Sequence, residues 1–141
     1  MQEIVSDLSW EMLDECPIQN EHDIVKARQI VRQFAKADGM GIVDQTRITT
    51  AVSELFRNMF FYAGGGKVLI EKGIFEEKIA LIITCIDEGP GIESIELAMT
   101  DGYTSGQGMG YGLPGSKRLV DRFDIYSIVN KGTTIRVMKW K

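Results

Sequence analysis

Two stretches in the first half of the chain carry apolar residues at helical spacing. In residues 23–37 and again in residues 45–62, apolar side chains recur every three or four positions, which places them on one face of an α-helix. Asp23 and Asp44 stand at the starts of these stretches, where a carboxylate can cap a helix. Glycines follow both stretches and would end the helices. The sequence therefore predicts two amphipathic helices, one directly after the other.

The other hydrophobic segments are shorter and richer in β-branched residues, which is typical of strands. They lie near residues 3–18, where one or two strands are expected, and near 67–72, 78–86, 123–130 and 133–140. Gly73 would join the middle pair of strands, and a turn at 130–132 would join the last pair. Short helices are expected at 93–99 and from Leu113 to Arg122, the latter with a proline in its first turn.

This order of elements predicts an α/β fold. Helices come first, strands with helices between them follow, and a hairpin closes the chain. We expect a two-layer sandwich in which helices cover one face of a mixed, mostly antiparallel sheet. The length of 141 residues fits a single domain over residues 1–141.

Composition and charge exclude several classes of protein. The net charge of −4 and the absence of a basic block disfavour nucleic-acid binding. The sequence has no apolar stretch of about 18 residues and no signal-peptide pattern, so we expect a cytoplasmic protein without a membrane span. Two distant cysteines, Cys16 and Cys85, and a single histidine, His22, indicate neither a disulfide framework nor a zinc site.

The strand expected at 78–86 leads into Asp87 and a turn that contains Gly89 and Gly91. A buried carboxylate there can accept a hydrogen bond from an amino group, such as that of adenine. Glycine tolerates positive φ and lets a ligand approach the backbone closely. Alone, this D-x-G-x-G pattern is weak, because most such turns simply end a strand.

A second pattern lies on the second predicted helix, where Glu54 and Asn58 are four residues apart and project from the same side. An amide oxygen suits Mg²⁺ that also binds phosphates, and a glutamate one turn earlier could take a proton from an attacking hydroxyl. By itself, such a pair is more often an exposed polar pair without a role. Arg57, which lies between them, could contact a phosphate, a partner or solvent.

A third pattern is the glycine-rich segment at 102–112. Gly108, Gly110 and Gly112 would let a lid close on phosphates, although a plain flexible loop has the same composition. The lid leads into the helix expected from Leu113, whose free N–H groups suit an anionic phosphate.

The order of these three patterns is more specific than any one of them. An acid and an amide on a helix, D-x-G-x-G after a strand and G-x-G-x-G before a helix resemble the N, G1 and G2 boxes of the GHKL ATPases. That family includes gyrase, Hsp90, sensor histidine kinases and MutL. In it a Gly-Thr pair often backs the adenine pocket, which points to Thr133; otherwise Thr133 is an ordinary strand residue. The P-loop pattern and the H-R-D and D-F-G motifs of the usual protein kinases are absent.

Within the GHKL family, residues 22–141 resemble the bacterial anti-sigma-factor-type serine kinases, and most closely the RsbT switch kinases of the stressosome. The matching segments are 25–29, 43–50, 53–55, 57–58, 62–64, 87–92, 112–115, 117–119 and 137–140. This resemblance implies that the chain transfers the γ-phosphate of ATP to Ser or Thr of STAS-domain scaffold proteins. Phosphorylated scaffolds would release the kinase, which then activates a phosphatase or another output protein by binding it.

In such a kinase, Mg²⁺ on Asn58 would bridge the phosphates, and Glu54 would orient and deprotonate the acceptor hydroxyl. The rival interpretation is a non-catalytic, ATP-sensing regulator of the anti-sigma type that acts by sequestration. Nucleotide binding needs only Asn58 and the glycine motifs, so the presence of Glu54 favours the kinase.

Overall fold

The computed structural model describes residues 10–75, 77–100 and 112–141. The strands are β1 (Trp10–Ile18), β2 (Gly66–Phe75), β3 (Lys78–Asp87), β4 (Arg122–Ile128) and β5 (Gly132–Trp140). The helices are α1 (Glu21–Ala37), α2 (Ile42–Ala63), α3 (Ile95–Ala98) and α4 (Leu113–Arg118). The strands form one sheet in the order β1-β2-β3-β5-β4.

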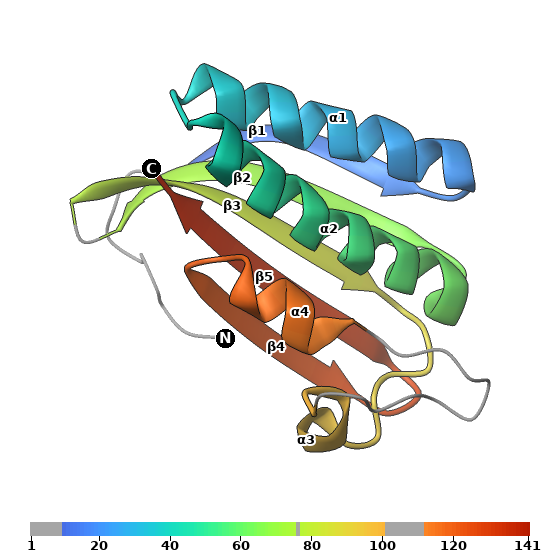
Figure 1. Cartoon of the computed structure of the whole chain (residues 1–141). Helices are drawn as coiled ribbons and strands as arrows, with labels where there is room; N and C mark the ends of the chain where they lie inside the picture. The colour runs from blue at the N-terminus through green and yellow to red at the C-terminus, as the bar shows by residue number, and fades with distance from the viewer. Residues whose placement is uncertain (1–9, 76, 101–111) are drawn as a thin grey trace.

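The helices α1 and α2 lie side by side across one face of the sheet, and α4 lies on the same face over β4 and β5 (Figure 1). This arrangement confirms the predicted two-layer α/β sandwich. Within the described strands, every neighbouring pair is antiparallel. Because β5 pairs with both β3 and β4, the chain between β3 and β4 crosses over the sheet. That crossover carries α3, the glycine-rich segment and α4.

The starts of both long helices differ from the prediction. Asn20 caps α1, since its Oδ1 accepts a hydrogen bond from the Asp23 backbone N–H at 2.9 Å. The helix α2 follows Gly41, which has no side chain to cap it. Asp23 and Asp44 were predicted as caps, and this was wrong. Both carboxylates instead lie inside the first turn, where they face the positive end of the helix dipole.

The prediction of a turn around Gly73 was also wrong. Gly73 lies inside β2, where it pairs with Trp10 of β1 and with Ala80 of β3. The strand β2 continues to Phe75, and β3 begins at Lys78. A glycine with strands on both sides stays in the ladder, because its N–H and C=O groups still find partners there.

The segment after the glycine-rich region contains a shorter helix than expected. The helix α4 ends at Arg118, because Arg122 already pairs with Met138 as the first residue of β4. The last two strands are joined where the sequence predicted, and Asn130 takes a left-handed conformation there with φ of 67°.

The hydrophobic core lies between the sheet and the helices. The apolar stripe of α2 is buried as predicted, and it consists of Ile48, Ala51, Val52, Leu55, Phe56 and Met59. Three alternate residues of β3 pack in the same hydrophobic core, namely Leu81, Ile83 and Cys85. The core therefore holds α2 firmly over the middle of the sheet, and this fixes the exposed polar residues of α2 relative to the end of β3.

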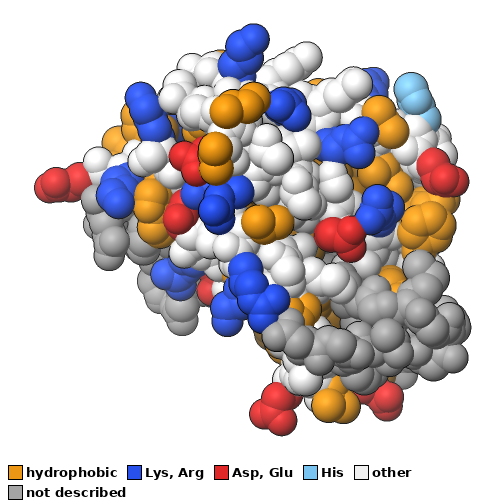
Figure 2. Space-filling view, in the orientation of Figure 1, with side chains coloured by type: hydrophobic (Ala, Val, Ile, Leu, Met, Phe, Trp, Pro, Cys, Tyr) orange, Lys and Arg blue, Asp and Glu red, His pale blue; other side chains and the backbone are white. Residues whose placement is uncertain are grey.

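On the helical face, charged side chains of both signs are spread between small groups of apolar ones (Figure 2). This is typical of the solvated side of amphipathic helices. Within the described residues, no helix is both long enough and apolar enough to cross a membrane.

Candidate nucleotide-binding site

A pocket opens between α2, the end of β3 and β5. The hollow is open to solvent on one side, and its volume is about 540 Å³ when the solvent at its mouth is counted. The lining residues are Leu55, Asn58, Met59, Tyr62, Ala63, Cys85, Asp87, Pro90, Gly91, Ile92, Leu113, Thr133 and Ile135. Five residues predicted from the sequence, namely Asn58, Asp87, Gly91, Leu113 and Thr133, thus meet around one hollow.

Asp87 is held at the end of β3 by the backbone. Its Oδ1 accepts hydrogen bonds from the Gly89 N–H at 2.9 Å and from the Thr133 N–H at 3.2 Å. Burial raises the pKa of the Asp87 carboxyl, and these two hydrogen bonds oppose the rise. Among the described residues, no hydrogen bond reaches Oδ2. The carboxyl group therefore has a fixed orientation and one oxygen left for a donor in the pocket.

The two glycines after Asp87 are required by the fold itself. A Cβ on Gly89 would lie 2.4 Å from the Cβ of Ala63, so the turn can only pack on the end of α2 without a side chain there. Gly91 has φ of +76°, and a Cβ on it would lie 2.4 Å from the Ile128 carbonyl oxygen. The structure thus adds a packing reason to the close ligand approach predicted for these positions.

Thr133 belongs to a hydrogen-bond network that the sequence did not reveal. Its hydroxyl lies 2.9 Å from the hydroxyl of Ser127, which also accepts from the Ile92 N–H at 2.8 Å and donates to the Gly132 carbonyl oxygen at 3.1 Å. Ser127 therefore ties the turn after β3 to the β4–β5 hairpin. No sequence motif marks Ser127, because its role depends on strands that meet only in the folded sheet.

Tyr62 and Cys85 also line the pocket without having been predicted there. Tyr62 lies four residues after Asn58 on α2, so the helical spacing that paired Glu54 with Asn58 would have found it. Cys85 was predicted as a core residue, and burial raises the pKa of its thiol. Its side chain is therefore an apolar part of the pocket floor.

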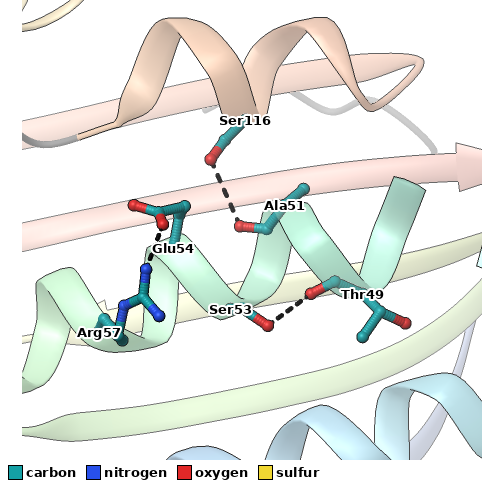
Figure 3. Close-up of polar contacts among 6 residues, drawn as sticks. All are labelled: Thr49, Ala51, Ser53, Glu54, Arg57 and Ser116. Atoms are coloured by element: carbon teal, nitrogen blue, oxygen red, sulfur yellow. Dashed lines mark hydrogen bonds and ion pairs between the residues drawn. The ribbon is translucent and has the colours of Figure 1, made fainter. Parts of the chain in front are cut away.

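Glu54 and Asn58 occupy different places around the pocket. Asn58 lines the hollow, whereas Glu54, one turn earlier on α2, is not among the lining residues. The Glu54 carboxylate pairs with Arg57 through Oε1, on the side of α2 that faces α4 (Figure 3). Its other oxygen lies close to Gly112, where a Cβ would be 2.6 Å from Oε2.

The short helix α4 is anchored against α2 beside this carboxylate. The Ser116 hydroxyl donates a hydrogen bond of 3.4 Å to the Ala51 carbonyl oxygen, as Figure 3 shows. Gly112, directly before α4, is left-handed with φ of +67°. Gly108 and Gly110, predicted as lid residues, lie outside the described residues. Within the part of the chain that the structure describes, no cluster of three or more His, Cys, Asp or Glu side chains could hold a metal ion.

Comparison with known proteins shows the family to which the elements around this pocket belong. Residues 43–141 match the family described as histidine kinase-, DNA gyrase B-, and HSP90-like ATPases. This chain belongs to that GHKL family. The match includes α2, the end of β3, α4 and β5, which are the elements that build the pocket.

Among the relatives of this GHKL protein is the serine/threonine-protein kinase RsbT of Bacillus subtilis. It is 50% identical over 123 residues, which are 87% of this chain and 92% of RsbT. An anti-sigma F factor of Caldanaerobacter subterraneus is 32% identical over 120 residues, or 81% of this chain and 82% of the factor. The predicted resemblance to the RsbT and anti-sigma-factor group is thereby confirmed.

A solved structure supports the fold independently. The crystal structure of the RsbU and RsbW domains of a Mycobacterium tuberculosis protein matches with a TM-score of 0.60 at 16% sequence identity. The match covers 90% of this chain but only 32% of the other chain. At such low identity, the likeness concerns the fold of the GHKL domain alone.

Proposed function

We propose that this GHKL protein is an ATP-dependent protein serine/threonine kinase. The observation that carries the proposal is the position of Glu54 beside a pocket that Asn58 and Asp87 line. A carboxylate just outside a nucleotide pocket can serve an acceptor that approaches from solvent. The 50% identity to a protein named as a serine/threonine kinase supports the same activity.

The adenine of ATP would occupy the deep end of the pocket. Oδ2 of Asp87 would accept a hydrogen bond from the adenine amino group, while Thr133 holds the carboxyl group from the other side. Gly91 shapes the turn beside the base, and Gly89 keeps that turn packed on α2. The apolar floor formed by Met59, Cys85 and Ile135 suits a flat aromatic ring.

The phosphates would lie toward Asn58 and the start of α4. The amide oxygen of Asn58 would bind Mg²⁺, which neutralises charge on the phosphates during transfer. A single protein ligand fits this ion, because Mg²⁺ commonly keeps waters and phosphate oxygens as its other ligands. Leu113, Gly112 and the preceding Gly108 and Gly110 would close the lid over the phosphates.

Glu54 would act as the general base. It lies one turn before Asn58 on the same helix, so it can reach an acceptor hydroxyl next to the γ-phosphate without binding the metal. Catalysis by a kinase is mostly positioning and charge stabilisation, and the base completes the alignment of the hydroxyl. The resemblance to RsbT suggests STAS-domain scaffold proteins as acceptors in the cytoplasm, with a phosphatase or another output regulator as the downstream partner.

A second candidate is a regulator that binds ATP but acts by sequestration. The anti-sigma F factors among the relatives favour it, since they are named for opposing a sigma factor and not for a kinase activity. The two candidates differ in what they require of Glu54, because sequestration does not need a base.

The experiment that tests the kinase is transfer of labelled γ-phosphate from ATP to a purified STAS-domain protein. We expect Mg²⁺-dependent labelling of a serine or threonine, and much weaker labelling at sub-saturating ATP with the Asp87→Asn variant as the control. Stable binding of the STAS-domain protein without any labelling would favour the sequestering regulator.

A further inference from the structure

Both oxygens of the Glu54 carboxylate have a defined neighbour in the structure. Oε1 forms an ion pair with Nη2 of Arg57, which lies three residues later on α2. Oε2 lies against the backbone of Gly112, where a Cβ would come within 2.6 Å. No other hydrogen bond or ion pair involves Glu54 among its described neighbours.

We propose that Arg57 is a positioning residue for phosphoryl transfer, which acts by holding the Glu54 carboxylate against the backbone of Gly112. The inference rests on the proposed kinase function, in which Glu54 is the base. A glutamate on a helix surface can adopt several side-chain conformations, and only some of them aim the carboxylate at an acceptor. If one conformation is already fixed before the acceptor arrives, the reaction does not have to pay the entropy of ordering the side chain.

Arg57 differs from a residue that binds ATP directly. It is not among the residues that line the pocket, although its neighbour Asn58 is. The Arg57 side chain is 51% exposed and that of Glu54 is 37% exposed. A pair this exposed contributes little to the stability of a fold. The effect of removing Arg57 should therefore be seen in the reaction rate, with little change in thermal stability.

Gly112 limits the position of the Glu54 carboxylate on the side opposite Arg57. With φ of +67°, this residue is left-handed, and a side chain on it would displace Oε2 of Glu54. Gly115, in the same short helix, has open space where a Cβ would be built, and its φ is ordinary. These two glycines form a matched pair for substitution.

The first test measures single-turnover transfer of labelled γ-phosphate to a STAS-domain protein at saturating ATP and acceptor. We expect Arg57→Ala to lower the rate of transfer by about 10- to 100-fold, the range that misplacement of a catalytic group produces. ATP affinity and the KM for the acceptor should stay within about twofold, because only the chemical step is affected. Arg57→Lys should recover part of the rate, since lysine keeps the charge but lacks the planar fork. Arg47→Ala, an exposed arginine on the same helix, is the control and should transfer at the native rate.

A double-mutant comparison shows whether Arg57 acts through Glu54. In a Glu54→Gln background, Arg57→Ala should cause no further loss, because the base that it positions is already absent. An equal loss in both backgrounds would mean that Arg57 contacts phosphate or acceptor itself, and the proposal would be wrong. A raised KM for the acceptor with an unchanged rate would also overturn it.

The second test compares the glycines of the α4 region. Gly112→Ala should lower the transfer rate, whereas Gly115→Ala should not, and circular dichroism would check that both variants are folded. Native transfer rates for both Arg57→Ala and Gly112→Ala would show that the positioning role is wrong, while the kinase function would still stand. Absence of transfer by the unmodified protein would instead remove the kinase function, and the positioning role with it.

Discussion

The two ends of the pocket are built in different ways. At the Asp87 end, backbone N–H groups from the turn after β3 and from β5 fix a half-buried carboxyl group. At the Glu54 end, the proposed functional side chains come from one side of α2, and the Glu54 carboxylate forms an ion pair within that helix. The first end depends on strands that are distant in sequence, and the second depends mostly on helical spacing.

This difference indicates what each end contributes. A carboxyl group held by the sheet is rigid, which suits recognition of a flat base. Side chains on an exposed helix can meet a protein acceptor that arrives from solvent. We therefore expect substitutions at the Asp87 end to affect binding, and substitutions at the Glu54 end to affect the rate of transfer.

The largest expected effect is on the rate of transfer in Glu54→Gln. The change preserves size and hydrogen bonding but removes the base, so transfer should fall by about 10²- to 10⁴-fold. ATP affinity and binding of the acceptor protein should stay close to native. Single-turnover transfer at saturating ATP measures this directly. A native rate would assign Glu54 a structural role, and a collapse of ATP affinity would place it on the metal.

The next effect is on nucleotide binding in Asp87→Asn. The amide places a donor where the adenine amino group needs an acceptor, and such a mismatch costs about 1–3 kcal/mol, or roughly 5- to 150-fold in affinity. Calorimetry with a non-hydrolysable ATP analogue provides the measurement, and circular dichroism checks the fold. Unchanged affinity in the folded variant would contradict the adenine assignment and the contrast between the two ends.

A smaller effect is expected for Asn58→Ala, at the point where the two ends meet. Alanine has the higher helix propensity, so the fold should be unaffected. The dependence of ATP binding on Mg²⁺ should be lost, because Asn58 supplies the proposed protein ligand of the ion. Titrations with and without Mg²⁺ would show this as two equal affinities. If the variant still binds ATP more tightly with Mg²⁺, another group holds the ion.

The smallest effect concerns stability and pH at Asp87. Burial raises the pKa of this carboxyl above its unfolded value, so the folded state binds the proton more tightly than the unfolded state does. The group therefore stabilises the fold as the pH falls and costs stability at neutral pH. Without nucleotide, Asp87→Asn should be at least as stable as the native protein at pH 7, and this advantage should shrink in acid. Urea unfolding at several pH values checks it, and a large loss of stability at pH 7 would mean that the carboxylate holds the fold together.

Helices and strands with a strong periodic pattern were predicted correctly from the sequence, whereas several of their boundaries were wrong. The stripe of α2 was correct, because a helix that packs on a sheet must bury one face. Asp44 and Gly73 were misassigned, because a carboxylate near a helix start and a glycine in a strand each fit more than one local structure. The neighbouring strands β1 and β3 decided the place of Gly73.

For the site, the sequence by itself determined which residues could act, and the tertiary structure decided how they meet. Motif order and spacing made Glu54, Asn58 and Asp87 candidates, since a helix fixes the first two relative to each other. The roles of Ser127 and Gly112 emerged only from the fold, because each touches a residue far away in the sequence. The spacing of residues along a helix or turn can be read from the sequence. Contacts between distant segments form only after the core has brought α2, β3 and β5 together.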